Sequence, residues 1–263
     1  MPSREDVVEF AVAVFRSAEE HDVKYPAAAF AYYGFVAFLP LLVLAVGLLD
    51  RAAVVRLDRS LPQLLAPEAQ LLVYESLAVA SGRAGATLFA IGVFAWSGAN
   101  MTVAFQTIVE RVEGLDGRTW GEQLRDAAGI FASLCLAVGS VVFTEGFVAA
   151  RSTVPFVTWL APGVLLVTLT LAFLPLYFVS SQVVTDLVSA LPGAITAALG
   201  WTSLVTGVVF YASNAGQYAL YGILSGIILI FTSLYIAAAA LMLGVVVNAT
   251  VAEFREASGA AGD

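Results

Sequence analysis

Long runs without a charged residue dominate the chain and are separated by short charged or glycine- and proline-containing stretches. The first run covers residues 25–49, which is 25 positions without a charge. Crossing about 30 Å of hydrocarbon takes about 20 apolar residues at a rise of about 1.5 Å each, so this run predicts a transmembrane helix. The 66 uncharged residues from 187 to 252 are too long for one helix and predict two. Their break falls between 211 and 218, where small and amide residues interrupt the run. Six spans are predicted in all, at residues 27–49, 84–109, 127–150, 163–182, 189–210 and 221–250.

The segments outside these spans have a different pattern. After Ser3 and Asp6, which resemble a capping box, apolar residues recur at helical spacing while charged residues take the other side. This predicts an amphipathic helix within residues 1–24, at the membrane interface or packed beneath the spans, that ends at His21-Asp22. Residues 67–80, in the long first connection, suit a short interfacial helix. Residues 253–263 are predicted to be a polar tail after a membrane domain that covers 25–252.

Two connections are predicted from charge and from helix-breaking residues. Residues 110–126 are expected to form a short charged loop in which Gly114 and Gly117 break the helices. Pro155 and Pro162 are expected to mark a loop before the fourth span.

The composition confirms that the chain belongs in a membrane. Hydrophobic residues make up 60% and charged residues 12% of the sequence, against roughly 25% charge in a soluble domain. The mean hydropathy is +0.90. We therefore predict an all-α, polytopic membrane protein of six spans. The single cysteine, Cys135, excludes an intramolecular disulfide.

The net charge is −8, which argues against nucleic-acid binding, because that affinity rests on lysine and arginine neutralising phosphate. Adaptation to high salt, which screens self-repulsion, is one hypothesis for such acidic loops; Lys24 is the only lysine.

The distribution of basic residues gives a weak preference for orientation. With the termini in the cytoplasm, seven bases lie inside and five outside, and only lysine and arginine count in this rule. We expect a cytoplasmic N-terminus.

Two pairs of similar segments suggest an internal repeat. Residues 37–41 of the first span recur as residues 172–176 of the fourth, and residues 131–134 of the third span resemble residues 231–234 of the sixth. Because three spans separate the copies, such a repeat would have inverted topology, as in many transporters. The alternative is chance similarity between apolar segments.

Polar groups and prolines inside the spans are the candidates for a functional site, since each polar group there needs a partner or water. Glu145 lies within a span but close enough to its end to reach the outer headgroup zone instead. Asn100 and Gln106 serve either as interhelical glue or as the lining of a cavity. Prolines inside helices free a carbonyl and allow a kink. We expect the substrate cavity among Tyr32, Tyr33, Pro40, Asn100, Gln106, Glu145, Pro175 and Tyr221.

Enzyme signatures are missing from the sequence. It has no HExxH, GxSxG, P-loop or CxxC pattern, and His21 is the only histidine, for which a solvated loop position is the alternative to a pH switch. We therefore expect no catalytic centre, no metal site and no cofactor.

Several motifs in order resemble the YihY/BrkB family of six-span membrane proteins, formerly mislabelled ribonuclease BN. They are residues 27–33 (AAAFAYY), 39–42 (LPLL), 191–194 (LPGA), Trp201, 210–211 (FY), 221–222 (YG) and 243–244 (LG) with Asn248. The chain departs from the family pattern at Ala37, near Ser233 and at Val246, where the family usually has Ser, Trp and Glu.

The resemblance implies a multi-pass protein of the cell (cytoplasmic) membrane that transports or flips an amphipathic or lipid-like substrate of the envelope. Membrane lipids are its expected partners. The alternative function is a structural or scaffolding membrane protein that supports envelope integrity without transport.

Overall fold

The computed structural model describes residues 4–48, 83–114, 119–150, 155–213 and 222–260 of the chain, and every regular element in these ranges is an α-helix. The all-α class is confirmed. The predicted helix at residues 67–80 and the centre of the break at 211–218 lie outside the described residues. The helices are α1 (Arg4–Glu20), α2 (Lys24–Leu48), α5 (Arg83–Glu113), α6 (Trp120–Ala150), α7 (Pro155–Ser180), α8 (Leu187–Ser213) and α9 (Gly222–Ala260).

Five of the described helices are long and apolar enough to cross a membrane, judged by length and composition. They are Leu88–Glu113, Gly121–Val148, Leu160–Ser180, Leu187–Tyr211 and Gly226–Arg255. The predicted first span corresponds to α2, in which the side chains at 39 and 41–48 lie outside those that the structure describes. A count of six spans therefore stays a prediction.

The connection between α5 and α6 is shorter than the predicted loop at 110–126. Gly114 follows α5 with a φ of +64°, a left-handed conformation that suits glycine after a helix end. At the start of α6, the backbone N–H of Thr119 donates to Glu122 Oε2 at 2.8 Å, and Glu122 N–H donates to Thr119 Oγ1 at 3.4 Å. This reciprocal capping box fixes where α6 begins. Gly114 is thus confirmed as a breaker, whereas Gly117 lies outside the described residues.

The loop predicted at Pro155 and Pro162 is wrong. Pro155 is the first residue of α7, where a missing N–H costs nothing because the first turn has no partner for it. Pro162 lies inside the helix, as do Pro175 further along α7 and Pro40 in α2. Membrane helices tolerate interior prolines because neighbouring groups satisfy the freed carbonyl.

The amphipathic N-terminal segment forms α1, and its predicted end is confirmed. Asp22 has a φ of +51°, so the chain leaves the helix at His21-Asp22 before α2 begins at Lys24. At the other terminus, α9 continues as a helix to Ala260, into the segment predicted to be a polar tail.

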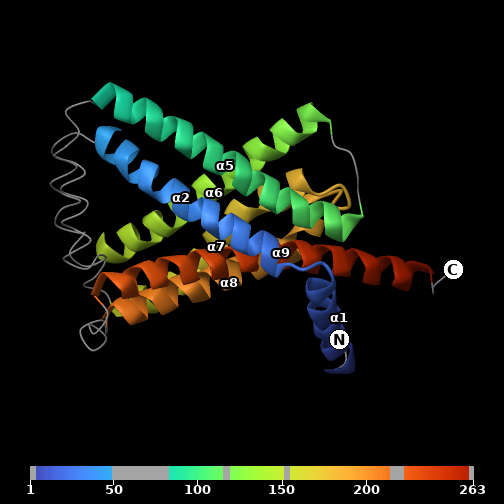
Figure 1. Ribbon diagram of the computed structural model, residues 1–263. Coiled ribbons are helices and arrows are strands. Elements are labelled where there is room, and N and C mark those ends of the chain that lie inside the picture. The colour runs from blue at the N-terminus through green and yellow to red at the C-terminus, as the bar shows by residue number, and fades with distance from the viewer. Residues whose placement is uncertain (1–3, 49–82, 115–118, 151–154, 214–221, 261–263) are drawn as a thin grey trace.

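The long helices form two groups that are joined along α2 and α9. Figure 1 shows α2 beside α5, and α8 packed along both α7 and α9. The helix α6 packs on α7 and crosses α5, where the rings of Phe94 and Phe131 lie 5.7 Å apart. Toward the end away from the termini, α2 and α5 diverge from α7, α8 and α9 (Figure 1).

In the proposed repeat, α5 and α6 correspond to α8 and α9, but these two pairs of helices pack differently. The helices α8 and α9 lie side by side, whereas α5 and α6 meet mainly at their crossing. The inverted repeat is not shown and stays a prediction.

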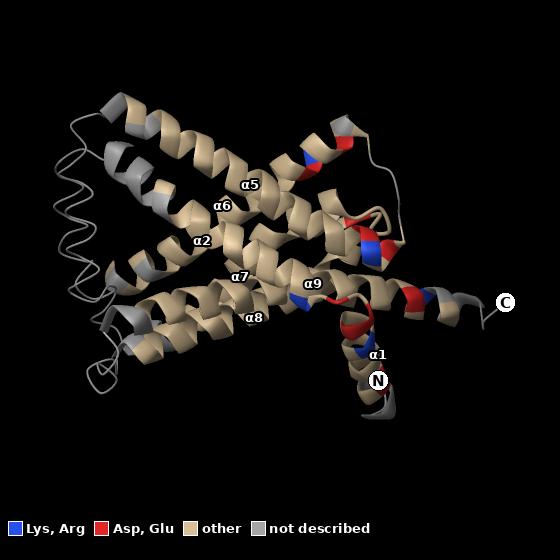
Figure 2. Ribbon diagram, viewed as in Figure 1, with Lys and Arg blue, Asp and Glu red and all other residues tan. Residues whose placement is uncertain are grey.

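The two ends of the bundle differ in charge and in burial. Both termini and the described charged side chains lie at one end, here called the terminal end, as Figure 2 shows. Most of the buried core also lies toward this end: among the described side chains, Thr202 is the last buried one along α8 and Ala237 the first along α9. Between 203 and 211 and between 226 and 236, no described side chain is buried.

Candidate functional site

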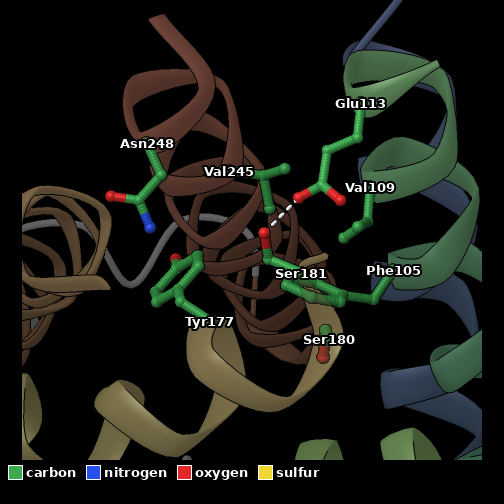
Figure 3. A pocket seen from close by; sticks show the side chains of 8 residues that line it. All are labelled: Phe105, Val109, Glu113, Tyr177, Ser180, Ser181, Val245 and Asn248. Atoms are coloured by element: carbon green, nitrogen blue, oxygen red, sulfur yellow. Dashed lines mark hydrogen bonds between the residues drawn. The ribbon is translucent and has the colours of Figure 1, made fainter. Parts of the chain in front are cut away.

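A small pocket lies at the terminal end, where α5, α7 and α9 converge (Figure 3). Its cavity volume is about 10 Å³, which is about the space that one water molecule needs. Polar and apolar side chains share its walls. It is lined by Phe105, Val109, Glu113, Tyr177, Ser180, Ser181, Val245 and Asn248.

Glu113 joins the end of α5 to the connection between α7 and α8. Its Oε1 accepts a short hydrogen bond from Ser181 Oγ, drawn as a dashed line in Figure 3, and its Oε2 accepts from the Gln182 N–H at 2.9 Å. Ser181 Oγ accepts in turn from the N–H groups of Val183, at 3.2 Å, and Val184, at 3.0 Å. A carboxylate that accepts from two donors makes strong, charge-assisted bonds, so this contact holds α5 against the α7–α8 connection.

Asp186 caps the start of α8. Its Oδ1 accepts from the Ser189 N–H at 2.7 Å, which satisfies one of the free donors of the first helical turn. Hydrogen bonds from Ser189, with a smaller contribution from the positive charge of Arg255, lower the pKa of Asp186 below its ordinary value. Arg255 Nη1 also donates to Ser189 Oγ at 3.4 Å, which links the end of α9 to the start of α8.

Tyr177 and Asn248 tie α7 and α8 to α9 within the core. The hydroxyl of Tyr177 is buried and donates to the Leu241 carbonyl at 2.7 Å. Asn248 Oδ1 accepts from the Gly193 N–H at 2.6 Å, and its Nδ2 donates to the Ala190 carbonyl at 3.4 Å. In Figure 3 the Asn248 amide points away from Glu113.

Glycines allow these helices to approach closely. A Cβ at Gly244 would lie 2.2 Å from Tyr177 Oη and 2.6 Å from the Gly193 carbonyl oxygen, and a Cβ at Gly193 would lie 2.4 Å from the Gly244 carbonyl oxygen. Small residues at a helix interface let backbones come into direct contact. The LPGA segment of α8 and the LG segment of α9 therefore meet, together with Asn248.

The predicted site residues on α2 and α5 lie partly together. The Tyr33 ring is 5.4 Å from the Trp96 ring and 5.2 Å from the Tyr32 ring, both edge-on, and Tyr32 is 52% exposed. Asn100 Nδ2 donates to the Trp96 carbonyl of its own helix at 2.8 Å. These four residues form an aromatic and amide group on the α2–α5 pair.

The remaining predicted residues are scattered. Gln106 is buried, and its Nε2 has no hydrogen-bond partner in the part of the chain that the structure describes. Pro40 is buried in α2 and Pro175 half-buried in α7. The Glu145 side chain and Tyr221 lie outside the described residues. Of the predicted residues whose side chains the structure describes, none lines the pocket, although Gln106 follows Phe105 and Pro175 lies two positions before Tyr177.

The pocket residues were missed because their partners are distant in the sequence. Glu113 bonds Ser181 across 68 positions, so no local pattern connects them, and the sequence places Glu113 in a charged loop. Asn248 entered only through the family resemblance, of whose motifs LPGA, LG and Asn248 meet between α8 and α9.

The resemblance to the YihY/BrkB family is tested by a family model, virulence factor BrkB, which matches residues 14–262. The chain belongs to the virulence factor BrkB family. As a BrkB-family chain it is an integral membrane protein, and its resemblance to this family is confirmed. Comparison with curated proteins and with solved structures gives no significant match.

Proposed function

We propose that this protein transports or flips an amphipathic, lipid-related substrate across the cytoplasmic membrane, with its termini in the cytoplasm. The observation that carries the proposal is the unequal packing of the two ends of the bundle. Labelling of Glu253→Cys by a membrane-impermeant thiol reagent only after permeabilisation would support the orientation, and labelling of intact cells would contradict it.

Alternating access requires one end of a bundle to be sealed while the other is less tightly packed. At the terminal end, polar contacts join α5, α7, α8 and α9, through Glu113, Tyr177 and Asn248. At the other end, α8 and α9 have no buried side chain between 203 and 211 or between 226 and 236. This pattern suits a transporter that is closed on the terminal side.

The aromatic and amide group on α2 and α5 suits an amphipathic substrate. Trp96 is 53% exposed and Tyr32 52% exposed, within the uncharged stretches of α5 and α2. Aromatic rings provide apolar area together with a polar edge, hydroxyl or N–H, so they can contact both parts of a lipid-like molecule.

Transport is tested by a flux assay on the purified protein in liposomes. The probe is a phosphatidylethanolamine with a fluorescent label on its headgroup, and dithionite quenches only the probe in the outer leaflet. We expect faster loss of the inner-leaflet signal than in protein-free liposomes. Equal rates would contradict a lipid-like substrate of this class.

Opening of the terminal end is tested in the same assay with a cross-linked variant. Glu113→Cys and Ser181→Cys are combined with Cys135→Ser, and the new pair is joined by a short bifunctional methanethiosulfonate. We expect flux to stop on cross-linking and to return on reduction, because the two positions must separate for release. Each single-cysteine variant treated with the same reagent is the matched control. Full flux in the cross-linked protein would contradict a moving terminal end.

One observation favours the alternative of a structural membrane protein without transport. The described pocket has room for about one water molecule, much less than a lipid-like substrate needs, and Glu113, Ser181 and Asn248 on its wall already have protein hydrogen-bond partners. A stoichiometric protein partner that co-purifies, together with flux equal to that of protein-free liposomes, would support this function over transport.

A further inference from the structure

The helix α1 has three separate faces. Phe10, Val14 and Ala18, four positions apart, lie toward α9: the Phe10 ring is 5.8 Å from that of Phe254, and Val14 and Ala18 pack on the core. Charged residues at 9, 16 and 20 form an exposed second face. Val8, Val12 and Phe15 form a third, here called the outer face.

The outer face consists of three exposed apolar side chains and ends at the exposed Glu19, which lies four positions after Phe15 on the same stripe. Val8 is 62%, Val12 49% and Phe15 72% exposed, although spacings of four and three place them on one stripe of the helix. Contact with α9 therefore buries only one part of the apolar surface of α1. A second apolar stripe beside a charged face is typical of a helix that lies in the membrane interface.

The position of α1 determines which surroundings its outer face can contact. Three residues connect α1 to α2, and Arg111 Nη1 donates to the His21 carbonyl at 3.5 Å, so α1 stays at the level where the first predicted span begins. Figure 1 shows α1 running across the long axis of α9. If α9 crosses the bilayer, α1 lies along its surface.

Neighbouring residues mark the same level as an interface. Tyr25 is 62% exposed, and the Lys24 ammonium lies 5.1 Å from the centre of its ring. Tyrosine and lysine are typical of the boundary between headgroups and hydrocarbon. At the same end, α8 begins with Leu187 and Val188, which are 55% and 63% exposed.

The charge of α1 selects the type of lipid. The helix carries two bases, Arg4 and Arg16, against five acids, so an anionic surface repels it overall. Insertion must come from apolar burial rather than from attraction to anionic headgroups.

We propose that the outer face of α1 docks into the headgroup–acyl boundary of the membrane that the bundle spans, with a preference for neutral headgroups. This inference does not depend on transport. It makes α1 a lateral anchor that is held on one side by α9 and on the other by lipid.

Spin labels on the full-length protein in lipid nanodiscs test this docking. Val8→Cys, Val12→Cys and Phe15→Cys report on the outer face, with Glu9→Cys and Arg16→Cys on the charged face as controls, all with Cys135→Ser. Collision with oxygen and with a water-soluble nickel chelate gives the depth of each label. We expect the outer-face labels at about 5–10 Å below the headgroups, rich in oxygen contact and shielded from nickel, and the control labels exposed to nickel.

Two other outcomes would overturn the proposal. Nickel contact on the outer face equal to that at Arg16→Cys would mean that this face lies in water. Exclusion of both reagents would mean that a protein, either a partner or a second copy, covers it. Repeating the measurement with equal parts of phosphatidylcholine and phosphatidylglycerol tests the charge preference: we expect no deeper insertion than in phosphatidylcholine alone, and deeper insertion would contradict it.

Discussion

The two ends of the α8–α9 pair are built from similar residues but pack differently. At the terminal end, a Cβ at Gly193, Gly200 or Gly244 would come within 2.4 Å of an atom of a neighbouring helix. At the other end, a Cβ at Gly207 or Gly226 would meet nothing within 4 Å. Glycine is therefore a contact residue at one end and an ordinary residue of an apolar helix at the other.

Polar side chains follow the same division. Asn248 at the terminal end bonds two backbone groups of another helix, whereas the bond of Asn100 among the described residues is to a carbonyl of its own helix, α5. Trp201 Nε1 likewise donates across to the Ala237 carbonyl at 3.0 Å. The terminal end is thus specified by contacts between helices, and a substitution there should cost more than its match elsewhere.

The largest effect is expected at the glycine contact. Gly244→Ala should destabilise the protein by about 3 kcal/mol, because the new methyl group overlaps the Tyr177 hydroxyl and a backbone carbonyl. Gly226→Ala is the matched control in the same helix and should be neutral or stabilising by up to about 1 kcal/mol, since alanine favours a helix over glycine. Unfolding in mixed micelles with increasing SDS measures both. Equal effects of the two substitutions would mean that the ends do not differ in packing.

A smaller difference is expected between the two asparagines. Asn248→Ala should cost about 1–2 kcal/mol, because it removes the side-chain partner of Gly193 N–H and Ala190 C=O in a buried place. Asn100→Ala should change stability by less than about 0.5 kcal/mol, since a half-exposed amide that bonds its own helix fixes no neighbour. The same SDS titration compares them, and a larger loss from Asn100→Ala would reverse the comparison.

The fold was largely predictable because a membrane span has a strong signal in composition alone. Uncharged runs located every long helix that the structure describes, but several helix ends were predicted too early or too late. Charge at 110 and 111 does not end α5, which continues to Glu113, because a helix that leaves the hydrocarbon continues where water solvates its charged residues. Local signals mark two of the true boundaries: Thr119 with Glu122, and Asp186 with Ser189.

The site was much less predictable. Prolines, tyrosines and amides inside the spans were chosen because polar groups there are costly, and they stay candidates. Trp96, which the structure places against Tyr33, was not among them. The sequence gives no indication that Gly244 meets Gly193 while Gly226 meets nothing. Such pairings depend on how the helices cross, which a hydropathy pattern does not encode.

The smallest effect concerns the cap that begins α8 at the terminal end. The hydrogen bonds from Ser189 lower the pKa of Asp186 in the folded protein, so the ionised cap stabilises α8 at pH values above the ordinary aspartate pKa of about 4. This stabilisation is lost as the pH falls through the lower pKa of the folded state. Asp186→Asn keeps an acceptor for the Ser189 N–H but has no charge to lose.

We therefore expect the melting temperature of the wild-type protein to exceed that of Asp186→Asn slightly at pH 6, with the difference shrinking to zero as the pH falls below about 4. Tryptophan fluorescence in detergent micelles between pH 3 and pH 7 measures it. Glu9→Gln, which removes an exposed carboxylate of α1, is the control for the loss of one negative charge. A difference that stays constant or grows on acidification would mean that the Asp186 charge does not hold the start of α8, and that the terminal end depends on its buried contacts alone.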